Sequence, residues 1–449
     1  MNTFDKIKEL YWNNNFMSDR QKEVVFAKVK AIVKGKVDTN ADDSMIKEYV
    51  TQVLNGQKLD NNFSVDYPVK KRIELTDEDA KLLAYYLPQY YPNKYNDAWW
   101  GKGSTEWTNV TKSVPQYLGQ YQPRLPGELG FYDLRIQDNI YRQIELAKIY
   151  GIYGFCFYYY WFDGVRLLDL PFDNFVNDET IDYPFCINWI NESWTKQWSG
   201  DSNLPLMEVV KTVESYKRFI ESCYKLFEKD NYIKIDGKPV LLIYKPLDVP
   251  EAEKVISYWR NYVKEKLGVD LYLIATINKQ GILREDFSVR GFDAISEFAP
   301  GPQLEYMEDI TKQKQYVCGS FYGKVYDYKK LIEDKAYFKV TGNKLYRAVS
   351  PMWDNTARKM NKGLVLDGAT PELYKTWLKD VIVETKNNKD LDDKLVFINA
   401  WNEWAEGTYL EPDLKWQYKY LEATKDAILE AREVSEKISE QQGGQTAVR

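Results

Sequence analysis

The sequence of 449 residues contains no histidine at all. A Ser-His-Asp triad, a Cys–His pair, a histidine general base and any histidine-ligated metal are therefore excluded. Acid–base chemistry in this chain has to use carboxylates, tyrosine, lysine or cysteine.

Cysteine is also scarce, with four residues that are far apart and form no Cys-x-x-Cys pair. This spacing argues against a zinc knuckle and a disulfide framework. Cys156 and Cys186 lie in apolar runs, where a free thiol behaves as a small buried hydrophobe. No metal ligands and no cofactor are predicted.

Long apolar runs are missing too. None approaches the roughly 18 to 20 residues of a membrane span, and the N-terminus lacks the apolar core of a secretion signal. We therefore expect a cytoplasmic protein with no membrane span. Basic residues do not dominate either, since 61 Lys and Arg face 67 Asp and Glu for a net charge of −6. That balance gives no basic surface for nucleic acid or an anionic membrane.

Residues 1–75 are predicted to form a small helical module and a polar linker. Ser18 and Gln21 make a capping-box pattern before a helical repeat that closes at Gly35, and a second helix ends at Asn55-Gly56. The module carries no chemistry, so we expect it to pack against the main domain or to bind a protein partner.

Residues 76–430 alternate short apolar runs with amphipathic segments. Eight such runs are found, at residues 82–88, 154–162, 184–190, 239–246, 271–277, 293–300, 345–353 and 395–401. Helix-period segments separate most of them, for example 141–151, 252–268 and 371–386. This order predicts a (β/α)₈ TIM barrel. An open doubly wound sheet is the competitor, but no Gly-rich phosphate turn follows the first run. Residues 431–449 are expected to be a helix end and a disordered tail.

Active sites of this fold lie at the carboxyl ends of the strands, so residues that end or follow the runs are the candidates. Aromatic rings can pack on the C–H faces of sugars, while carboxylates and amides bind hydroxyls. The aromatic content of 15% and the clustering at strand ends therefore predict a site for an oligo- or polysaccharide. The expected substrate-binding residues are Tyr91, Glu106, Trp107, Tyr159, Trp161, Asn191, Glu192, Trp194, Trp353, Asp354, Arg358, Asn402 and Trp404.

The stretch FINAWNEWAEGTYLEP, residues 397–412, contains the candidate catalytic pair, Glu403 and Glu406. An unpaired carboxylate among tryptophans is costly to bury, and glycosidic bond chemistry typically uses two carboxyl groups. The alternative is that both glutamates favour a helix N-terminus after the N-cap Asn402. Glu192 has a similar alternative as a surface ion pair.

The ordered motifs YLPQYYP, WWGKGSTEWTNV, YQPRLPGELGFYDLR, CINWINESWT, PMWDNTAR and INAWNEWAEGTYLEPD resemble the WbsX-type polysaccharide-biosynthesis family, whose domain is related to glycoside hydrolase family 99. The resemblance covers residues 82 to about 425 and implies a (β/α)₈ barrel. It also implies that Glu403 acts as a base on the 2-hydroxyl of the sugar, which closes a 1,2-anhydro ring. Glu406 then acts as general acid and afterwards as base.

The chain departs from these families at several positions. The hydrolase motif has a histidine where this chain has Ala405, and the WbsX-type pattern often has histidine in place of Tyr91, Tyr159 and Arg124. Tyrosine can replace a histidine's hydrogen bond but is no base near neutral pH without a large pKa shift.

Three functions stay open on the sequence. The first is a retaining or transglycosylating glycosidase, with double displacement by Glu192 and Glu403 as a mechanistic variant. The second is a glycosyltransferase of lipopolysaccharide biosynthesis, which needs a phosphate site; only Arg358, Arg124 and Lys102 are candidates for it. The third is a glycan-binding barrel without catalysis.

Overall fold

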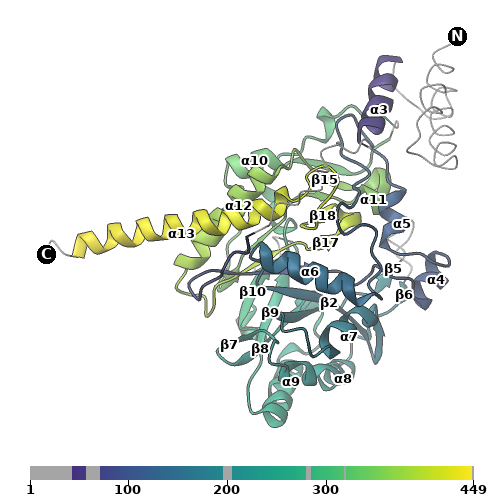
Figure 1. Ribbon diagram of the computed structural model, residues 1–449. Helices are drawn as coiled ribbons and strands as arrows, with labels where there is room; N and C mark the ends of the chain where they lie inside the picture. Colours follow the sequence, from purple (N-terminus) through teal and green to yellow (C-terminus); the bar gives the residue numbers. More distant parts are fainter. Residues whose placement is uncertain (1–42, 57–70, 196–204, 280–284, 318–319, 447–449) are drawn as a thin grey trace.

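The computed structural model describes residues 43–56, 71–195, 205–279, 285–317 and 320–446 (Figure 1). The predicted first helix near residues 18–35 and the linker at 57–70 lie outside these residues. The predicted second helix is confirmed as α3, Asp43–Gly56.

A closed parallel sheet forms the centre of the molecule. Its order is β12-β10-β9-β8-β4-β2-β1-β16-β13, and every neighbouring pair is parallel. Because β12 and β13 are two parts of one extended segment, the sheet closes on itself and the predicted (β/α)₈ barrel is confirmed. Each of the eight runs supplies a strand: β1 (Lys81–Tyr86), β2 (Gly154–Phe162), β4 (Phe185–Trp189), β8 (Lys238–Ile243), β9 (Tyr272–Ile277), β10 (Ala294–Glu297), β12 (Leu345–Tyr346) with β13 (Ala348–Val349), and β16 (Leu395–Ile398).

Helices cover the outside of the barrel (Figure 1). The three helix-period segments predicted between strands are α6, α9 and α12, and α12 starts at Pro371 behind the N-cap Thr370. The final helix continues to Thr446 and extends away from the barrel, so it is longer than the sequence analysis expected. Its Glu-, Lys- and Gln-rich sequence favours a helix over a disordered tail. Apart from α3, the described helices with nine or more residues are α6 (Gln137–Ile149), α7 (Asp169–Asn177), α8 (Val213–Cys223), α9 (Ala252–Leu267), α12 (Pro371–Asn387) and α13 (Lys419–Thr446).

Strand β2 shows how side chains divide between the two sides of the barrel wall. All nine of its residues are buried, as expected for a parallel strand covered on both faces. Phe157 packs on Phe172 and Phe175 of α7, whereas Tyr158 stacks on Tyr85 in the interior. The alternation therefore turns every second aromatic residue of β2 inward.

A buried ion pair joins β10 to the segment that contains β12 and β13. Glu297 ends β10, and its carboxylate accepts from the Ala348 backbone N–H at 2.9 Å and from Arg347 Nη1 at 3.0 Å. The same Arg347 nitrogen donates to the Val340 carbonyl at 2.7 Å. The carboxylate thus takes the place of a ladder bond at the break between β12 and β13.

Helix α3 contacts the barrel through a loop. The Gln52 amide donates to the Gln120 carbonyl at 2.8 Å and accepts from the Gly119 N–H at 2.9 Å. The described helix of the N-terminal module therefore packs on the loop that follows α5 (Glu106–Thr111). A protein partner for the module stays a prediction.

We expect Glu297→Ala to lower the free energy of unfolding by about 3 kcal/mol, because the buried Arg347 then keeps the Val340 carbonyl but has as its ion-pair partner only the more distant Glu384, at 3.4 Å. Urea unfolding followed by tryptophan fluorescence measures the change. Glu253→Ala, at an exposed position of α9, is the matched control and should shift the value by no more than about 0.5 kcal/mol. Equal stability of both variants would contradict a structural role for the Glu297–Arg347 pair.

Candidate active site

A cavity of about 150 Å³ opens at the carboxyl ends of the barrel strands. Its wall comes from the residues that end or follow β2, β4, β8, β10 and β16, together with one residue of α11 (Thr356–Lys359). The lining residues are Tyr158, Tyr160, Ile190, Glu192, Ser193, Trp194, Tyr244, Phe298, Arg358, Glu403 and Glu406. Five of the fifteen residues predicted from the sequence are in this set.

Both candidate catalytic glutamates lie on a tight loop after β16. Glu403 ends the short strand β17 (Asn402–Glu403), and Glu406 ends the 3-10 turn η10 (Trp404–Glu406). Strand β18 (Thr408–Tyr409) then pairs antiparallel with β17. Gly407 allows this reversal, because its φ is +61° and a Cβ there would meet the Asp354 backbone at 2.7 Å. A single 3-10 turn, rather than an α-helix, therefore brings the two glutamates to one side.

The loop is fixed from behind by buried polar contacts. The Asn402 amide accepts from the Leu87 N–H at 2.7 Å and donates to the Leu87 carbonyl at 3.1 Å. The Trp404 indole N–H donates to Glu411 at 2.6 Å, and its ring stacks on Tyr409 at 3.8 Å. Asn402 and Trp404 do not line the cavity, so the structure gives them a positioning role.

The Arg358 guanidinium binds three carboxylates. Its Nη2 lies 2.8 Å from Glu403, its Nη1 lies 2.6 Å from Glu406, and its Nε lies 2.6 Å from Glu106. The side chains of Arg358, Glu106 and Glu403 are at most 6% exposed, and that of Glu406 is 21% exposed toward solvent. Four residues predicted separately from the sequence therefore form one charged cluster.

The cluster has more negative than positive charge, because one guanidinium faces three carboxylates. Burial raises the pKa of Glu403 to about 8, against the lowering effect of Arg358, and the neighbouring Glu406 and Glu106 add to the rise. Like charges in one buried site disfavour full ionisation of all members. The cluster consequently retains a proton near neutral pH.

Aromatic rings form much of the remaining wall. The Tyr160 and Trp194 rings meet edge to face at 5.0 Å, and those of Tyr244 and Phe298 do so at 5.3 Å. Among these residues the sequence analysis selected only Trp194. Tyr244 and Phe298 directly follow β8 and β10, so the strand-end rule could have found both. The sequence could not distinguish Tyr158 and Tyr160 from Tyr159 and Trp161, because all nine residues of β2 are buried and the alternation does not say which set faces inward.

Some predicted residues lie outside the cavity wall. Tyr159 and Trp161 point outward from β2, where both pack against Phe219 of α8. The Asn191 amide accepts from the Lys245 N–H at 2.7 Å and donates to its carbonyl at 2.9 Å. Asn191 therefore fixes the adjoining loops.

Glu192 lines the cavity at its exposed rim. Its carboxylate pairs with Lys245 Nζ at 3.2 Å, and its side chain is 52% exposed. The ion pair considered as an alternative was one with Lys196, which lies outside the described residues. Glu192 pairs with Lys245 and faces the cavity as well.

The remaining predicted residues are Trp107, Asp354, Trp353 and Tyr91. Glu106 begins α5, beside Trp107, whose ring packs on Trp404 at 5.6 Å. Asp354 is fully buried and accepts from the Thr356 N–H, the Thr356 hydroxyl and Gln120. Trp353, in β14 (Trp353–Asp354), and Tyr91 are not among the residues that line the cavity.

The four positions where the resemblance implied a histidine are also outside the cavity wall. Ala405 and Tyr91 are buried in the hydrophobic core, and Tyr159 lies under the Arg166 guanidinium at 5.0 Å. Arg124 lines a separate cavity behind the loop of the two glutamates. None of the four replaces a group in the wall of the candidate site.

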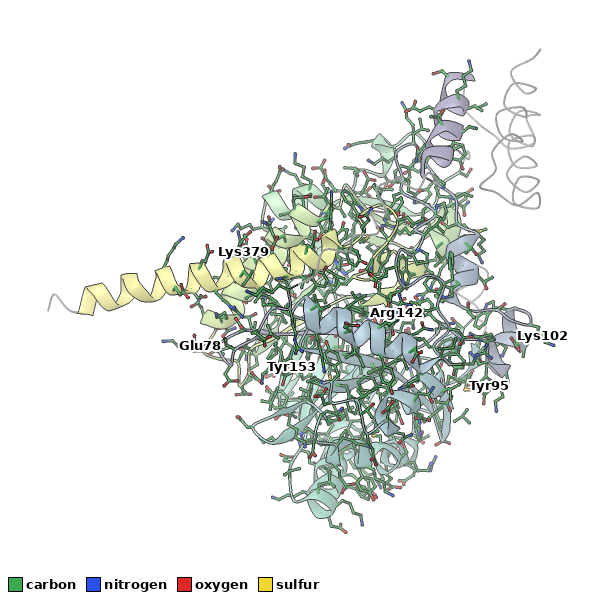
Figure 2. The ribbon with its side chains drawn as sticks, viewed as in Figure 1. Glu78, Tyr95, Lys102, Arg142, Tyr153 and Lys379 are labelled. Atoms are coloured by element: carbon green, nitrogen blue, oxygen red, sulfur yellow. The ribbon has the colours of Figure 1, made fainter. Side chains whose placement is uncertain are left out.

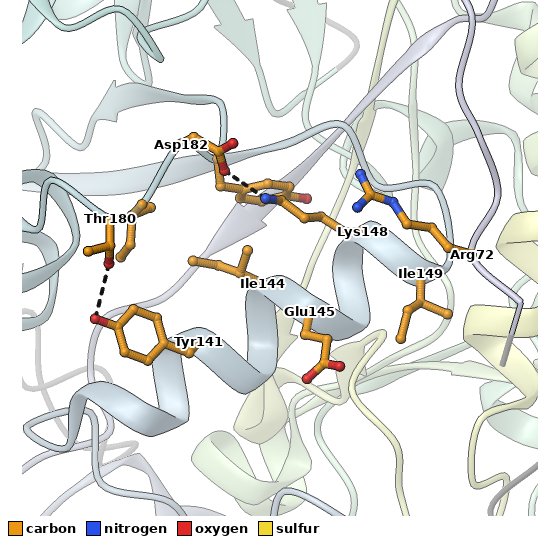
Figure 3. Close-up of a pocket in the computed structure, with 10 residues that line it drawn as sticks. Arg72, Tyr141, Ile144, Glu145, Lys148, Ile149, Thr180 and Asp182 are labelled. Carbon is orange, nitrogen blue, oxygen red and sulfur yellow. Dashed lines mark hydrogen bonds and ion pairs between the residues drawn. The ribbon is translucent and has the colours of Figure 1, made fainter. Parts of the chain in front are cut away.

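A groove of about 360 Å³ lies elsewhere, between α6 and the segment that leads into β4 (Figure 3). Within it Lys148 pairs with Asp182 at 2.7 Å, and the hydroxyls of Tyr141 and Thr180 are 3.3 Å apart. The groove is near the amino ends of β2 and β4, opposite the face where the two glutamates lie. It therefore does not belong to the candidate active site.

Lys102, one of the three cations considered for a phosphate site, lies on an exposed loop at the periphery, close to Tyr95 in Figure 2. Within the described ranges no cluster of Cys, Asp and Glu has metal-binding geometry. No helix in that part of the chain has the length and apolarity to cross a bilayer.

We expect the stability difference between Glu403→Gln and wild type to depend on pH. Between the ordinary pKa of 4.5 and about 8, folded wild type keeps a proton that the unfolded chain releases, so its stability falls as pH rises through this window. Glutamine carries no such penalty. The variant should gain on the order of 2–4 kcal/mol relative to wild type from pH 5 to pH 8 in urea unfolding.

The exposed Glu372→Gln is the matched control, and its difference from wild type should stay constant over the same range. A constant difference for Glu403→Gln as well would show that Glu403 is ionised throughout and that the cluster's proton lies on another group.

Comparison with known proteins agrees with the geometry. The sequence model of the family described as Glycosyltransferase WbsX matches residues 82–424. Two proteins of Xanthomonas campestris pv. campestris strains, both described as uncharacterized protein WxcX, are 39% identical over 359 residues, which is 80% of this chain and 51% of theirs. The chain thus spans about half the length of these relatives.

A solved structure of the GH99 endo-alpha-mannosidase from Bacteroides thetaiotaomicron aligns with a TM-score of 0.50 at 14% identity, over 81% of this chain and all of that one. At this identity the likeness concerns the fold alone. From the match over residues 82–424 and the two relatives, the chain belongs to the WbsX glycosyltransferase family.

Proposed function

We propose that the protein is a retaining, endo-acting glycosidase on a bacterial or mannose-type polysaccharide, with Glu403 and Glu406 as its catalytic pair. The observation that carries the proposal is the charged cluster, in which one buried guanidinium brings both carboxylates to the wall of a cavity at the carboxyl ends of the strands. A pair of carboxyl groups beside aromatic rings supplies what glycosidic bond cleavage requires.

The proton content of the cluster supports this assignment. Cleavage needs one carboxylate that accepts a proton and one carboxylic acid that donates one. The raised pKa of Glu403 puts a proton in the cluster near neutral pH, and the proposed first step requires that this proton lie on Glu406 when the substrate is bound, so that Glu403 is ionised and can act as the base. No histidine is needed for either step.

In the proposed first step, Glu403 takes the proton of the sugar's 2-hydroxyl while the 2-oxygen forms a bond to the anomeric carbon. The bond from that carbon to the leaving oxygen breaks, and Glu406 gives the leaving oxygen its proton. In the second step Glu406 takes a proton from water, whose oxygen attacks the anomeric carbon. The 2-oxygen leaves that carbon and recovers its proton from Glu403, so the configuration is retained.

Arg358 has a positioning role in this proposal. Its contacts at 2.6 and 2.8 Å hold the two carboxylates on adjacent guanidinium nitrogens, and its third contact ties the cluster to Glu106 at the start of α5. One guanidinium contact to each carboxylate limits the conformations of both glutamates before the substrate binds.

Glycosyl transfer is the second candidate, and the family's own description favours it. If a sugar hydroxyl replaces water in the second step, the same pair of glutamates forms a new glycosidic bond. A nucleotide-activated donor would in addition require a phosphate site. A barrel that only binds glycan is the third candidate and would not depend on either glutamate.

The deciding experiment measures products from α-mannan-type and bacterial O-antigen oligosaccharides, first without and then with nucleotide sugars. Wild type should release reducing ends without nucleotide sugar. Glu403→Gln and Glu406→Gln should each lower the rate by at least about a hundredfold, because each removes one end of the proton transfer. Glu372→Gln on α12 should keep the wild-type rate.

Glu192→Gln separates the two retaining mechanisms. A loss as large as that of Glu403→Gln would indicate double displacement by these two residues. Transfer that occurs only with a nucleotide sugar would establish the transferase instead. If wild type and all variants bind glycan and none forms a product, the protein is a glycan-binding barrel without catalysis.

A further inference from the structure

A second cavity, of about 310 Å³, lies behind the loop that carries the two glutamates. The two cavities are close neighbours, because a Cβ on Gly407 would meet the Asp354 backbone at 2.7 Å and Arg124 Nε at 3.0 Å. Arg124 and Asp354 both line the second cavity. Its wall therefore touches the back of the reaction loop.

Two cations, Arg124 and Lys415, line this cavity together with two carboxylates, Asp354 and Asp367. The Arg124 side chain is 8% exposed, and its Nη2 lies 3.9 Å from the nearest carboxylate oxygen, that of Asp354. Its Nη1 donates to the Met352 sulfur at 2.8 Å, its side chain also interacts with the Tyr409 hydroxyl, and its Nε is buried with no hydrogen-bond partner. Lys415 Nζ forms no ion pair within the described part of the chain and lies over the Tyr121 ring at 4.6 Å.

The carboxylates nearby are already occupied. Asp354 accepts from Gln120 and from two groups of Thr356, and Asp367 accepts from Tyr117 at 2.8 Å and pairs with Lys314 at 2.6 Å. Asp413 likewise accepts from Tyr409 and Tyr121 and from the Trp416 backbone. These interactions leave the two cations with unused capacity for an anion.

Further donors point to the same ligand chemistry. The cavity also includes residues 368–370, which directly precede helix α12. Tyr420 lines it as well, is 3% exposed, and its buried hydroxyl has no partner. Burial and the nearby Arg124 lower the pKa of Lys415, as expected for two cations held close together.

Aromatic residues give the cavity a second property. Lys415 lies 4.6 Å from the Tyr121 ring and 4.9 Å from the Trp416 ring, and both rings line the cavity. Exposed aromatic surface of this kind suits the C–H face of a sugar ring, while the cations suit a charged substituent.

We propose that this cavity binds a sugar that carries a carboxylate or phosphate group, with Arg124 and Lys415 on the anion. Such a group can come from an acidic unit of the glycan or from the phosphate of an activated sugar donor. The site is independent of the proposed reaction, because none of its ligands is Glu403 or Glu406.

Isothermal titration calorimetry on the full chain tests this site with three probes, namely glucuronic acid, glucose 1-phosphate and glucose. Wild type should bind at least one anionic probe and bind glucose at least about tenfold more weakly. Lys415→Gln should weaken binding of the anionic probe by about tenfold, because it removes the positive charge. Lys415→Glu should weaken binding further, because it places a negative charge at the same position. Rising salt should weaken binding in parallel.

Lys254→Gln on α9 is the control and should bind like wild type. Preference for glucuronic acid would assign the site to an acidic glycan unit, and preference for glucose 1-phosphate would assign it to an activated donor. Equal binding of glucose and the anionic probes, no binding of any probe, or wild-type affinity in both Lys415 variants would overturn the proposal. Measuring Glu403→Gln separately distinguishes this result from failure of the reaction, because that variant should retain the anion affinity.

Discussion

The Arg358 guanidinium holds three carboxylates from two separate segments of the chain, and the candidate active site depends on that arrangement. Glu106 comes from the loop after the first strand, while Glu403 and Glu406 come from the loop after the last. A charge buried to this extent is stable only when it is paired. Because one cation faces three buried anions, its contacts hold the loops together, while burial and repulsion between the carboxylates raise the pKa of Glu403.

The barrel supplies the rigid frame that this cluster needs. Closure between β10 and the β12–β13 segment relies on Glu297 and Arg347, a second buried ion pair at the ends of strands. Asn402 joins the loop after β16 to the loop after β1 through both atoms of its amide. Charged and amide side chains thus continue, beyond the strand ends, the connections that backbone hydrogen bonds make within the sheet. This explains why many polar residues near the site are buried and yet do not line the cavity.

The absence of histidine limits the acid–base chemistry of the chain, but it removes no side chain from the cavity wall. Ala405, Tyr91 and Tyr159 lie in the core or outside the barrel wall, so their identities leave the cavity itself unchanged. Arg124 is different, since it lines the neighbouring cavity with Lys415. At that position a permanent cation, rather than a titrating ring, faces the space behind the reaction loop.

The sequence by itself determined the eight strands, their parallel order and the end of the barrel where the site lies, because apolar runs and helical periods are local properties. It also placed Arg358, Glu106, Glu403 and Glu406 among the candidates, since all follow predicted strands. Only the tertiary structure decided which of them meet. Whether Tyr158 or Tyr159 faces the interior depends on strand register, and the joining of Glu106 to Arg358, 252 positions apart, depends on closure of the barrel. Contacts of that range leave no periodic signal in a single chain, because they arise only when distant loops converge on the same face.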